Sequence, residues 1–465
     1  MYRPTRIFGS RSPLFVCALF AFLGFALVMP ASTSDPNLRD FANPTGMVRT
    51  FSATGSVDTS NPFFQSMGTN GRTCFSCHQP DQAWSVAPSQ IRERFVDSDG
   101  LDPIFRTVDG ANCPSADVST RQARRRSYSM LLEKGLIRVS LPVPANAEFE
   151  VTGVSDPHGC PQTTSQQLAL FRRPLPSTNL VFLSTVMWDG RETAPGKSIE
   201  SDLLQQAKDA TLGHAEALTA PTDQQAAQIV AFELGLFTAQ TRDHAAGPLN
   251  QAGARGGPQI LSTQPFHLGI NDSFGGDPSG APFNPVTFDI FQNWTDPADS
   301  AHEGAREAIA RGEKLFNTLV IPITGVAGIN DALGQPVLMG TCTTCHDTPN
   351  AGNHSLSVPL NIGVTDFPAV APLDTTGLPV YTLVCKATGQ KFTVTDPGRA
   401  MISGKCKDIG KTKGPILRGL AARAPYFHNG SAATLLDVVN FYDARFHLGM
   451  AERQKLDLVA FLRAL

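Results

Sequence analysis

The chain contains one short pattern twice: two cysteines three positions apart, with a histidine directly after the second. The two copies are Cys74, Cys77 and His78 in RTCFSCHQPD, and Cys342, Cys345 and His346 in GTCTTCHDTP. This spacing lets both thiols form thioether bonds to one porphyrin while the adjacent imidazole binds its iron. The pattern therefore predicts two covalently bound haem c groups, one for each copy.

Two other kinds of site use the same residue types. A structural zinc site takes cysteine and histidine ligands, and a redox-active dithiol needs only the C-x-x-C part. The histidine that follows each pair and the duplication of the whole pattern favour haem over both alternatives.

Length and charge limit the classes of function. A chain of 465 residues is long enough for two or three domains, each with its own core. The net charge of -3 argues against a general nucleic-acid binder, which needs a strongly basic face. Small molecules or other proteins are the expected partners, and the sequence leaves the oligomeric state open.

The N-terminus has the layout of a secretory signal: three arginines before residue 12, an apolar run at 14–29, and the small residues of PASTSD. We expect a signal peptide over 1–34, with cleavage near Ala31–Ser34 and export to the periplasm. The alternative is an uncleaved membrane anchor, although the run is shorter than a usual membrane span.

Cysteine usage agrees with export. Of nine cysteines, Cys17 lies in the apolar run and four belong to the haem motifs. The remaining four are Cys113, Cys160, Cys385 and Cys406. In an oxidising compartment four thiols suggest two disulfides, and nearness in the sequence favours Cys113 with Cys160 and Cys385 with Cys406 among the three connectivities. Free thiols are the alternative.

The clear periodicity is helical. Capping boxes are predicted at Ser300 with Glu303, Thr222 with Gln225, and Thr434 with Asp437, and the residues 451–465 form an amphipathic helical pattern. Two Pro- and Gly-rich segments, 142–180 and 247–298, are predicted to be ordered loops. We expect a mainly α fold of two cytochrome c-like haem domains with long loop insertions, at 35–298 and 299–465.

Two further stretches carry a resemblance to a known family: MWDGRE at 187–192 and GPILRGLAARAPYFHNGSAATLLDVVNFY at 414–442. With the paired haem motifs, they resemble the bacterial dihaem cytochrome c peroxidases, which include the MauG enzymes. The resemblance runs from about residue 60 to the end, with 80–160 and 247–298 as insertions. It implies that hydrogen peroxide is reduced at the first haem with electrons relayed by the second. A small redox protein, a cytochrome c or a cupredoxin, would be the electron donor.

The resemblance also implies roles for individual residues. Trp188 matches the family tryptophan between the two haems, the alternative being a buried structural tryptophan. Glu216 matches the active-site glutamate, whose carboxylate can take a proton from peroxide and return it. His214 lies two residues earlier and is a second candidate for this proton transfer, or else a surface histidine.

The sequence departs from the family pattern at both haems. Ser165 stands near the position of the distal histidine that many members have on the first haem, and His158 is the only substitute nearby. We therefore expect a first haem that is open at rest. At the second haem Tyr442 replaces a methionine, as in the MauG branch, and a phenolate would favour ferric iron. The alternatives are ligation by Met401, Met450 or His447, with Tyr442 as a core residue.

The family also binds calcium between its domains, but the asparagine that helps to hold it is Arg173 here, so calcium is doubtful. A basic run, Arg121 and Arg124–Arg126, is either a docking patch for an acidic redox partner, a contact to a haem propionate, or a solvated helix face. Two other functions fit the same residues: a MauG-like oxidative enzyme with a protein or small-molecule substrate, and a dihaem electron carrier without turnover.

Overall fold

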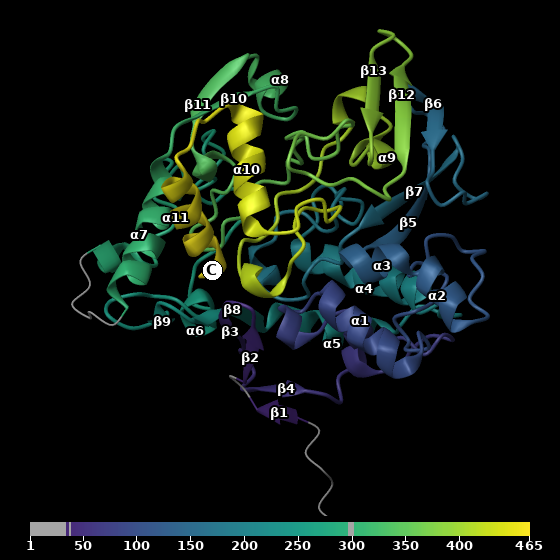
Figure 1. Ribbon diagram of the computed structural model, residues 1–465, viewed down its shortest axis with the longest axis horizontal. Helices are drawn as coiled ribbons and strands as arrows, with labels where there is room; N and C mark the ends of the chain where they lie inside the picture. Colours follow the sequence, from purple (N-terminus) through teal and green to yellow (C-terminus); the bar gives the residue numbers. More distant parts are fainter. Residues whose placement is uncertain (1–33, 37–38, 296–301) are drawn as a thin grey trace, which may run out of the picture. The chain divides into compact units, whose positions relative to one another are not determined.

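Short helices and small sheets share the chain in the computed structural model, which describes residues 34–36, 39–295 and 302–465 (Figure 1). The helices are α1 Pro88–Ser98, α2 Arg121–Ser127, α3 Ser129–Lys134, α4 Ile199–His214, α5 Asp223–Leu234, α6 Pro258–Leu261, α7 Glu303–Thr318, α8 Asn330–Leu333, α9 Ala400–Ser403, α10 Leu435–Phe446 and α11 Glu452–Arg463. Within the described residues, no helix is both long and apolar enough to cross a membrane.

The strands of the described residues form five sheets of two to four strands each. They are β1 Ser34–Pro36, β2 Asp40–Asn43, β3 Gly46–Ser52, β4 Ser56–Asp58, β5 Ile137–Pro142, β6 Phe149–Ser155, β7 Gln167–Arg172, β8 Leu236–Asp243, β9 Gly247–Pro248, β10 Ile321–Thr324, β11 Val337–Gly340, β12 Val380–Cys385 and β13 Lys391–Val394. The expectation of a mainly α fold is therefore not confirmed, because strands account for much of the structure between the helices.

The predicted helix starts hold where their residues are described. Thr222 and Gln225 form a capping box at the start of α5, and Thr434 and Asp437 form one at the start of α10. Ser300 lies outside the described residues, and α7 begins at Glu303. The sequence after Thr222 has a helical pattern that predicts a helix through 226–240, but the helix ends at Leu234 and the strand β8 begins at Leu236.

The segment 142–180 is not the loop that its sequence predicts. It contains β6 and β7, which pair with strands far apart in the sequence: β7 with β5, and β6 with β12. Figure 1 shows β6 beside β12, with β13 on the other side of β12. The register between β6 and β12 shifts between Thr382 and Leu383, which interrupts the regular pairing that would give a strand its alternating apolar pattern.

Both predicted disulfides are present. Cys113 is bonded to Cys160 and Cys385 to Cys406, with Cα–Cα separations of 5.4 and 6.0 Å. Each bond closes a segment outside the haem motifs: the first closes 113–160, and the second closes 385–406, which contains β13 and α9.

Residues 34–465 form one compact unit. The chain end is one reason: the carbonyl of Leu465 accepts hydrogen bonds from the backbone N–H groups of Gln240 and Gly419, and Arg463 forms an ion pair with Asp243. The expected domain boundary at 298/299 lies outside the described residues, and the two-domain division stays a prediction.

Candidate haem sites

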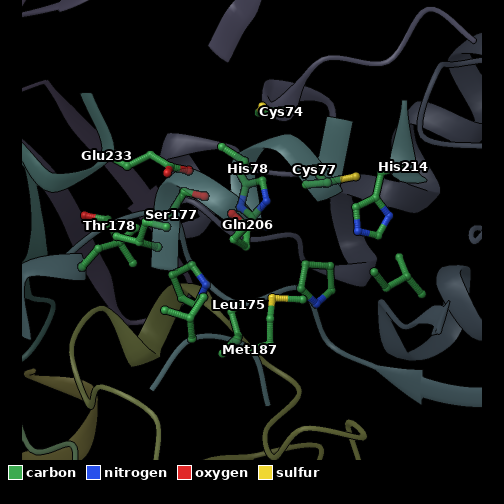
Figure 2. Close-up of a pocket in the computed structure, with 18 of the residues that line it drawn as sticks. Cys74, Cys77, His78, Leu175, Ser177, Thr178, Met187, Gln206, His214 and Glu233 are labelled. Atoms are coloured by element: carbon green, nitrogen blue, oxygen red, sulfur yellow. The ribbon is translucent and has the colours of Figure 1, made fainter. Parts of the chain in front are cut away.

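The first haem motif opens onto a cavity with about 1610 Å³ of empty space. One face of α4 lines it at helical spacing through Leu203, Gln206, Ala210 and His214. Figure 2 shows Cys74, Cys77, His78, Glu233 and His214 around this cavity, with Met187 and Leu175 also on its wall.

The two motifs have the same backbone conformation. Cys74–Ser76 and Cys342–Thr344 are single 3-10 turns, and each begins at a threonine whose backbone and side chain bond the third residue of the turn. The two motifs are therefore local copies in structure as well as in sequence. Both cysteines of each motif lie on the cavity wall beside their histidine.

The motif histidines are prepared as metal ligands. His78 donates from Nδ1 to the carbonyl of Trp84 at 2.9 Å, and His346 donates from Nδ1 to the carbonyl of Gly352 at 2.6 Å. Such a bond fixes the tautomer and leaves Nε2 with a free lone pair. Burial lowers the pKa of His78 to about 4, so the ring is neutral, as a metal-binding imidazole must be.

The second motif opens onto another cavity, with about 1540 Å³ of empty space. Helix α10 lines it with one face, through Leu435, Val438, Val439, Tyr442 and Phe446. These residues recur at three- and four-residue intervals, so one side of the helix faces the cavity.

The thiols of the motifs fit thioether attachment. Cys74, Cys77, Cys342 and Cys345 are free, whereas the other four described cysteines are paired. Burial raises the pKa of Cys74, Cys342 and Cys345 to about 12, so they are neutral thiols rather than reactive thiolates. Among the described residues, no group of three His, Cys, Asp or Glu side chains could hold a metal ion, so a tetrahedral zinc site is not formed.

Buried cations on the first cavity lack a protein anion. Arg173, Lys413, Arg418 and Arg423 are buried or nearly so, line this cavity, and form no ion pair with a described carboxylate. Burial lowers the pKa of Lys413 to about 7 and of Arg418 to about 9. The Nε atoms of Arg418 and Arg423 have no hydrogen-bond partner. An unpaired buried cation is costly, so these residues fit a ligand that brings carboxylates, as the propionates of haem would.

Trp188 lies on the wall of both cavities. Its indole N–H donates to the carbonyl of Arg173 at 2.8 Å, and its ring meets that of His428 edge-on, with centroids 6.1 Å apart. The next residue, Asp189, is fully buried and bound by Arg172, which also pairs with Asp396. The indole is therefore held in place between the two cavities. Lys413 shares this position and also lines both.

Tyr442 lies on the wall of the second cavity, and burial raises its pKa. Of its three rivals, only Met450 also lines this cavity. Met401 packs in a separate core cluster with β6 and β12, and His447 ends α10 with an exposed side chain. The structure thus reduces the candidates for a second iron ligand to Tyr442 and Met450, with His354 and His428 also on the wall.

The two candidates for proton transfer lie differently. His214 is the last residue of α4 and lines the first cavity. Glu216 is exposed and does not line it; its carboxylate accepts a hydrogen bond from Asn70 at 2.9 Å. The chain turns through a left-handed conformation at Glu216, with φ of 52°, so this side chain leaves the helix face that lines the cavity.

Neither Ser165 nor His158, the residues considered for the distal position of the first haem, lines the first cavity. Ser165 lies in the turn between β6 and β7, away from both cavities. His158 is bound elsewhere, through Nε2 to the carbonyl of Gly377 at 2.9 Å. His214 is thus the only histidine besides His78 among the described residues that line the first cavity.

Arg173 stands where the family has an asparagine that helps to bind calcium, and its side chain donates hydrogen bonds to several backbone carbonyls. Its guanidinium donates to the carbonyls of Lys134, Gly135, Val86 and Arg423 at 2.6 to 3.2 Å. The guanidinium supplies a positive charge to oxygens of the kind that calcium prefers. Calcium is therefore not favoured at these carbonyls.

The basic run does not reach either cavity. Arg121 pairs with Asp99 at the surface, and Arg124 donates to the carbonyls of Asp99 and Val118. None of its members lines a described cavity. The geometry agrees with a solvated helix face more closely than with a propionate contact.

Several cavity residues carried no sequence pattern. Asp109 and Glu233 lie on the wall of the first cavity, as does Lys413. Burial raises the pKa of Glu233 to about 7, and its Oε2 has no hydrogen-bond partner. For Lys413 alone the sequence offers a signal, because this residue directly precedes the stretch that carries the family resemblance. Asp109 and Glu233 reach the cavity only through folding.

No protein-family model matches the chain. Cytochrome-c peroxidase IdrP1 of Denitromonas iodatirespirans is 34% identical over 139 residues, covering 27% of this chain and 36% of the relative. Cytochrome-c peroxidase IdrP1 of Pseudomonas sp. (strain SCT) is 29% identical over 144 residues with the same coverage. The chain thus spans about a third of the length of the curated relatives it matches. Over that part, the similarity supports an oxidoreductase related to cytochrome-c peroxidases.

Two solved structures are similar over most of the chain, but weakly. A MauG-like protein associated with microbial copper homeostasis covers 94% of both chains, with 15% identity and a TM-score of 0.39. Hydrazine synthase of Kuenenia stuttgartiensis covers 82% of this chain and 93% of its own, with 13% identity and a TM-score of 0.33. Both TM-scores are too low to establish a shared fold.

Proposed function

We propose that this chain is an exported dihaem c-type peroxidase that reduces hydrogen peroxide at the first haem, with electrons reaching it through the second. The observation that carries the proposal is the pair of large cavities, each with one C-x-x-C-H motif on its wall and with Trp188 on the wall of both. The curated relatives named cytochrome-c peroxidases support the same reaction.

Each part of the chain has a defined task in this proposal. The motif cysteines would hold the porphyrins, and Nε2 of His78 and of His346 would bind the irons. When bound, haem supplies an iron that can pass electrons to peroxide. Nε2 of His214 accepts a proton from one peroxide oxygen and returns it to the other, which leaves as water. Trp188 offers an oxidisable ring between the two sites, and the buried cations bind the propionates.

The reaction consumes electrons and protons in equal number as peroxide becomes water. A small redox protein, a cytochrome c or a cupredoxin, would supply the electrons at the second haem. We also propose the periplasm as the place of action, because the chain begins like a secretory signal and both disulfides suit an oxidising compartment.

Haem loading is the first test. The mass of the denatured mature protein should show two haem additions, because each cavity holds a complete motif. Cys74→Ala/Cys77→Ala and Cys342→Ala/Cys345→Ala should each remove one addition. A wild-type chain with one haem or none would refute the dihaem proposal, whatever its activity.

Turnover is the second test. Stopped-flow mixing of the fully reduced holoprotein with peroxide should show oxidation of both haems, and a reduced cytochrome c or cupredoxin should sustain turnover. A protein that carries both haems but does not react with peroxide would instead be an electron carrier. Electron paramagnetic resonance separates the two functions beforehand, since an enzyme needs one iron with an open position.

Tyr442 on the second cavity favours one alternative, a MauG-like enzyme that oxidises a protein or a small molecule. A phenolate ligand stabilises oxidised iron, which suits an enzyme that takes electrons from its substrate. Efficient turnover with a redox-protein donor would count against this alternative.

A further inference from the structure

His214 is held by a carboxylate from a distant part of the chain. Its Nδ1 lies 2.5 Å from Oδ2 of Asp109, which is 105 residues earlier, within the segment 80–160 that resembles an insertion. Asp109 is buried, whereas the side chain of His214 is 40% exposed and lines the first cavity. A carboxylate can only accept, so Nδ1 of His214 carries the proton and Nε2 keeps its lone pair.

Arg72 fixes this carboxylate. Its Nη1 donates to the other oxygen of Asp109 at 2.5 Å and to the backbone carbonyl of His214 at 3.2 Å. Two more carbonyls, of Pro103 and Ile104, accept from the same guanidinium. Burial alone would raise the pKa of Asp109, but the charge of Arg72 and the bond to His214 outweigh it and lower that pKa. Asp109 is therefore ionised.

The backbone around Asp109 leaves little freedom. The carbonyl of Asp109 accepts from the N–H of Arg138 at 2.7 Å. A Cβ atom at the neighbouring Gly110 would lie 2.9 Å from the carbonyl oxygens of Arg106 and Ile104, so this turn requires glycine. The carboxylate is thus presented to His214 by a rigid turn rather than by a mobile loop.

We propose that Asp109 is a positioning residue for His214: it holds the imidazole in the tautomer whose Nε2 accepts a proton inside the first cavity. Its negative charge also stabilises the imidazolium that forms when the proton arrives. The arrangement follows the logic of histidine–aspartate pairs in hydrolases, where the carboxylate orients the base without taking the proton. The inference rests on the proposed function in one respect: that function makes peroxide the molecule that donates the proton.

Two other charged groups are linked to His214 through Asn70, whose amide donates to the carbonyl of His214. Glu216 follows it and is bound by Asn70, while Arg106 donates to the carbonyl of Asn70. Burial lowers the pKa of His78 and its bond to the Trp84 carbonyl opposes that effect, while a positive charge on His214 would lower the pKa further. Arg72 and Asp109 complete the set, and only Asp109 bonds a ring nitrogen of His214.

Asp109→Asn is the decisive change. Because Arg72 keeps its bond to the amide oxygen, the amide NH₂ would face Nδ1 of His214 and move the ring proton to Nε2. That nitrogen then donates and no longer accepts. Cyanide is the probe, since HCN must give up its proton to a base when cyanide binds an open haem. We expect Asp109→Asn to slow cyanide association by about a hundredfold, like His214→Gln.

Two comparisons separate positioning from a general structural effect. The matched control is Asp223→Asn, which removes an exposed carboxylate at the start of α5 that pairs with Lys208 of α4, the helix that ends at His214. This variant should leave the rate unchanged. In the His214→Gln background, Asp109→Asn should have no further effect. If Asp109→Asn alone does not fold, Arg72→Gln/Asp109→Asn removes both buried charges together.

The outcomes are distinct. An unchanged cyanide rate in Asp109→Asn, a further loss in the His214→Gln background, or failure of the wild type to bind cyanide would each overturn the positioning role. If cyanide association shows the expected pattern but the wild type does not consume peroxide, the positioning role stands and the proposed function fails.

Discussion

At the scale of single residues, the position of Trp188 carries the most functional weight. Its indole lies on both cavity walls and is held by the carbonyl of Arg173 and the ring of His428. Burial in such a fixed position would let the ring change oxidation state without rearrangement of its neighbours. The role as a relay remains a proposal, and substitution can test it.

Trp188→Phe should keep both haems and the reaction of the first haem with peroxide, because neither depends on the indole. Electron transfer from the second haem to the first should slow by at least about tenfold, since phenylalanine is harder to oxidise. Stopped-flow spectra resolve the two haems. Trp294→Phe, a fully buried tryptophan on neither cavity wall, is the control. Equal rates in both variants would remove the relay role.

Tyr442→Met should raise the reduction potential of the second haem, because a thioether favours ferrous iron more than a phenolate does. Spectroelectrochemical titration measures the change. Met450→Leu, on the same cavity wall, should leave the potential nearly unaltered. The reverse pattern would make Met450 the ligand and Tyr442 a core residue.

At the scale of elements, two helices present the side chains that matter. Helix α4 lines the first cavity and ends at His214, while α10 lines the second cavity and carries Tyr442. Both begin at a side chain that caps the first turn, Ser198 for α4 and Thr434 for α10. The start of each helix is therefore set by side chains close in the sequence.

Thr434→Ala should lower the free energy of unfolding by about 1 kcal/mol, the usual cost of losing an N-cap. Thr434 accepts from the N–H of Asp437 and donates to its carboxylate, and alanine loses both bonds. Denaturant unfolding measures the change, and Thr434→Ser should restore most of the stability. An unaltered midpoint in the alanine variant would show that packing of α10 alone fixes its start.

At the scale of the whole molecule, a buried ion network ties sequence-distant segments together. Arg172 on β7 pairs with Asp189 and Asp396, and all three side chains are almost fully buried. Burial alone would raise the pKa of Asp189, but the charges of Arg172 and Arg191 outweigh it and hold this pKa at about 2. The network joins the loop after Trp188 to the second half of the chain.

This depressed pKa predicts acid sensitivity. The ionised Asp189 stabilises the fold above its ordinary pKa of 3.8, and this contribution is lost as the pH falls from there towards about 2. The free energy of unfolding, measured between pH 5 and about 2, should therefore fall as the pH drops through that window. Asp189→Asn should be less stable near pH 7 and show a flatter acid dependence. Identical slopes in both proteins would contradict the prediction.

The sequence by itself determined the features that depend on short spacings. The C-x-x-C-H repeats, the caps of α5 and α10, and the disulfides between cysteines near in sequence all follow from residues close along the chain. Local geometry limits what such residues can reach, so the pattern identifies the feature. The family resemblance made His214 and Tyr442 candidates, and the structure places both on cavity walls.

Only the tertiary structure decided what meets across long separations. It brought Asp109 to His214, turned Glu216 away from the cavity, and placed unpaired Lys413 at both cavity walls. It also paired β6 with β12 in a segment predicted to be a loop. Contacts of this kind depend on burial and on strand partners far away in the sequence, and neither leaves a periodic pattern in the residues themselves.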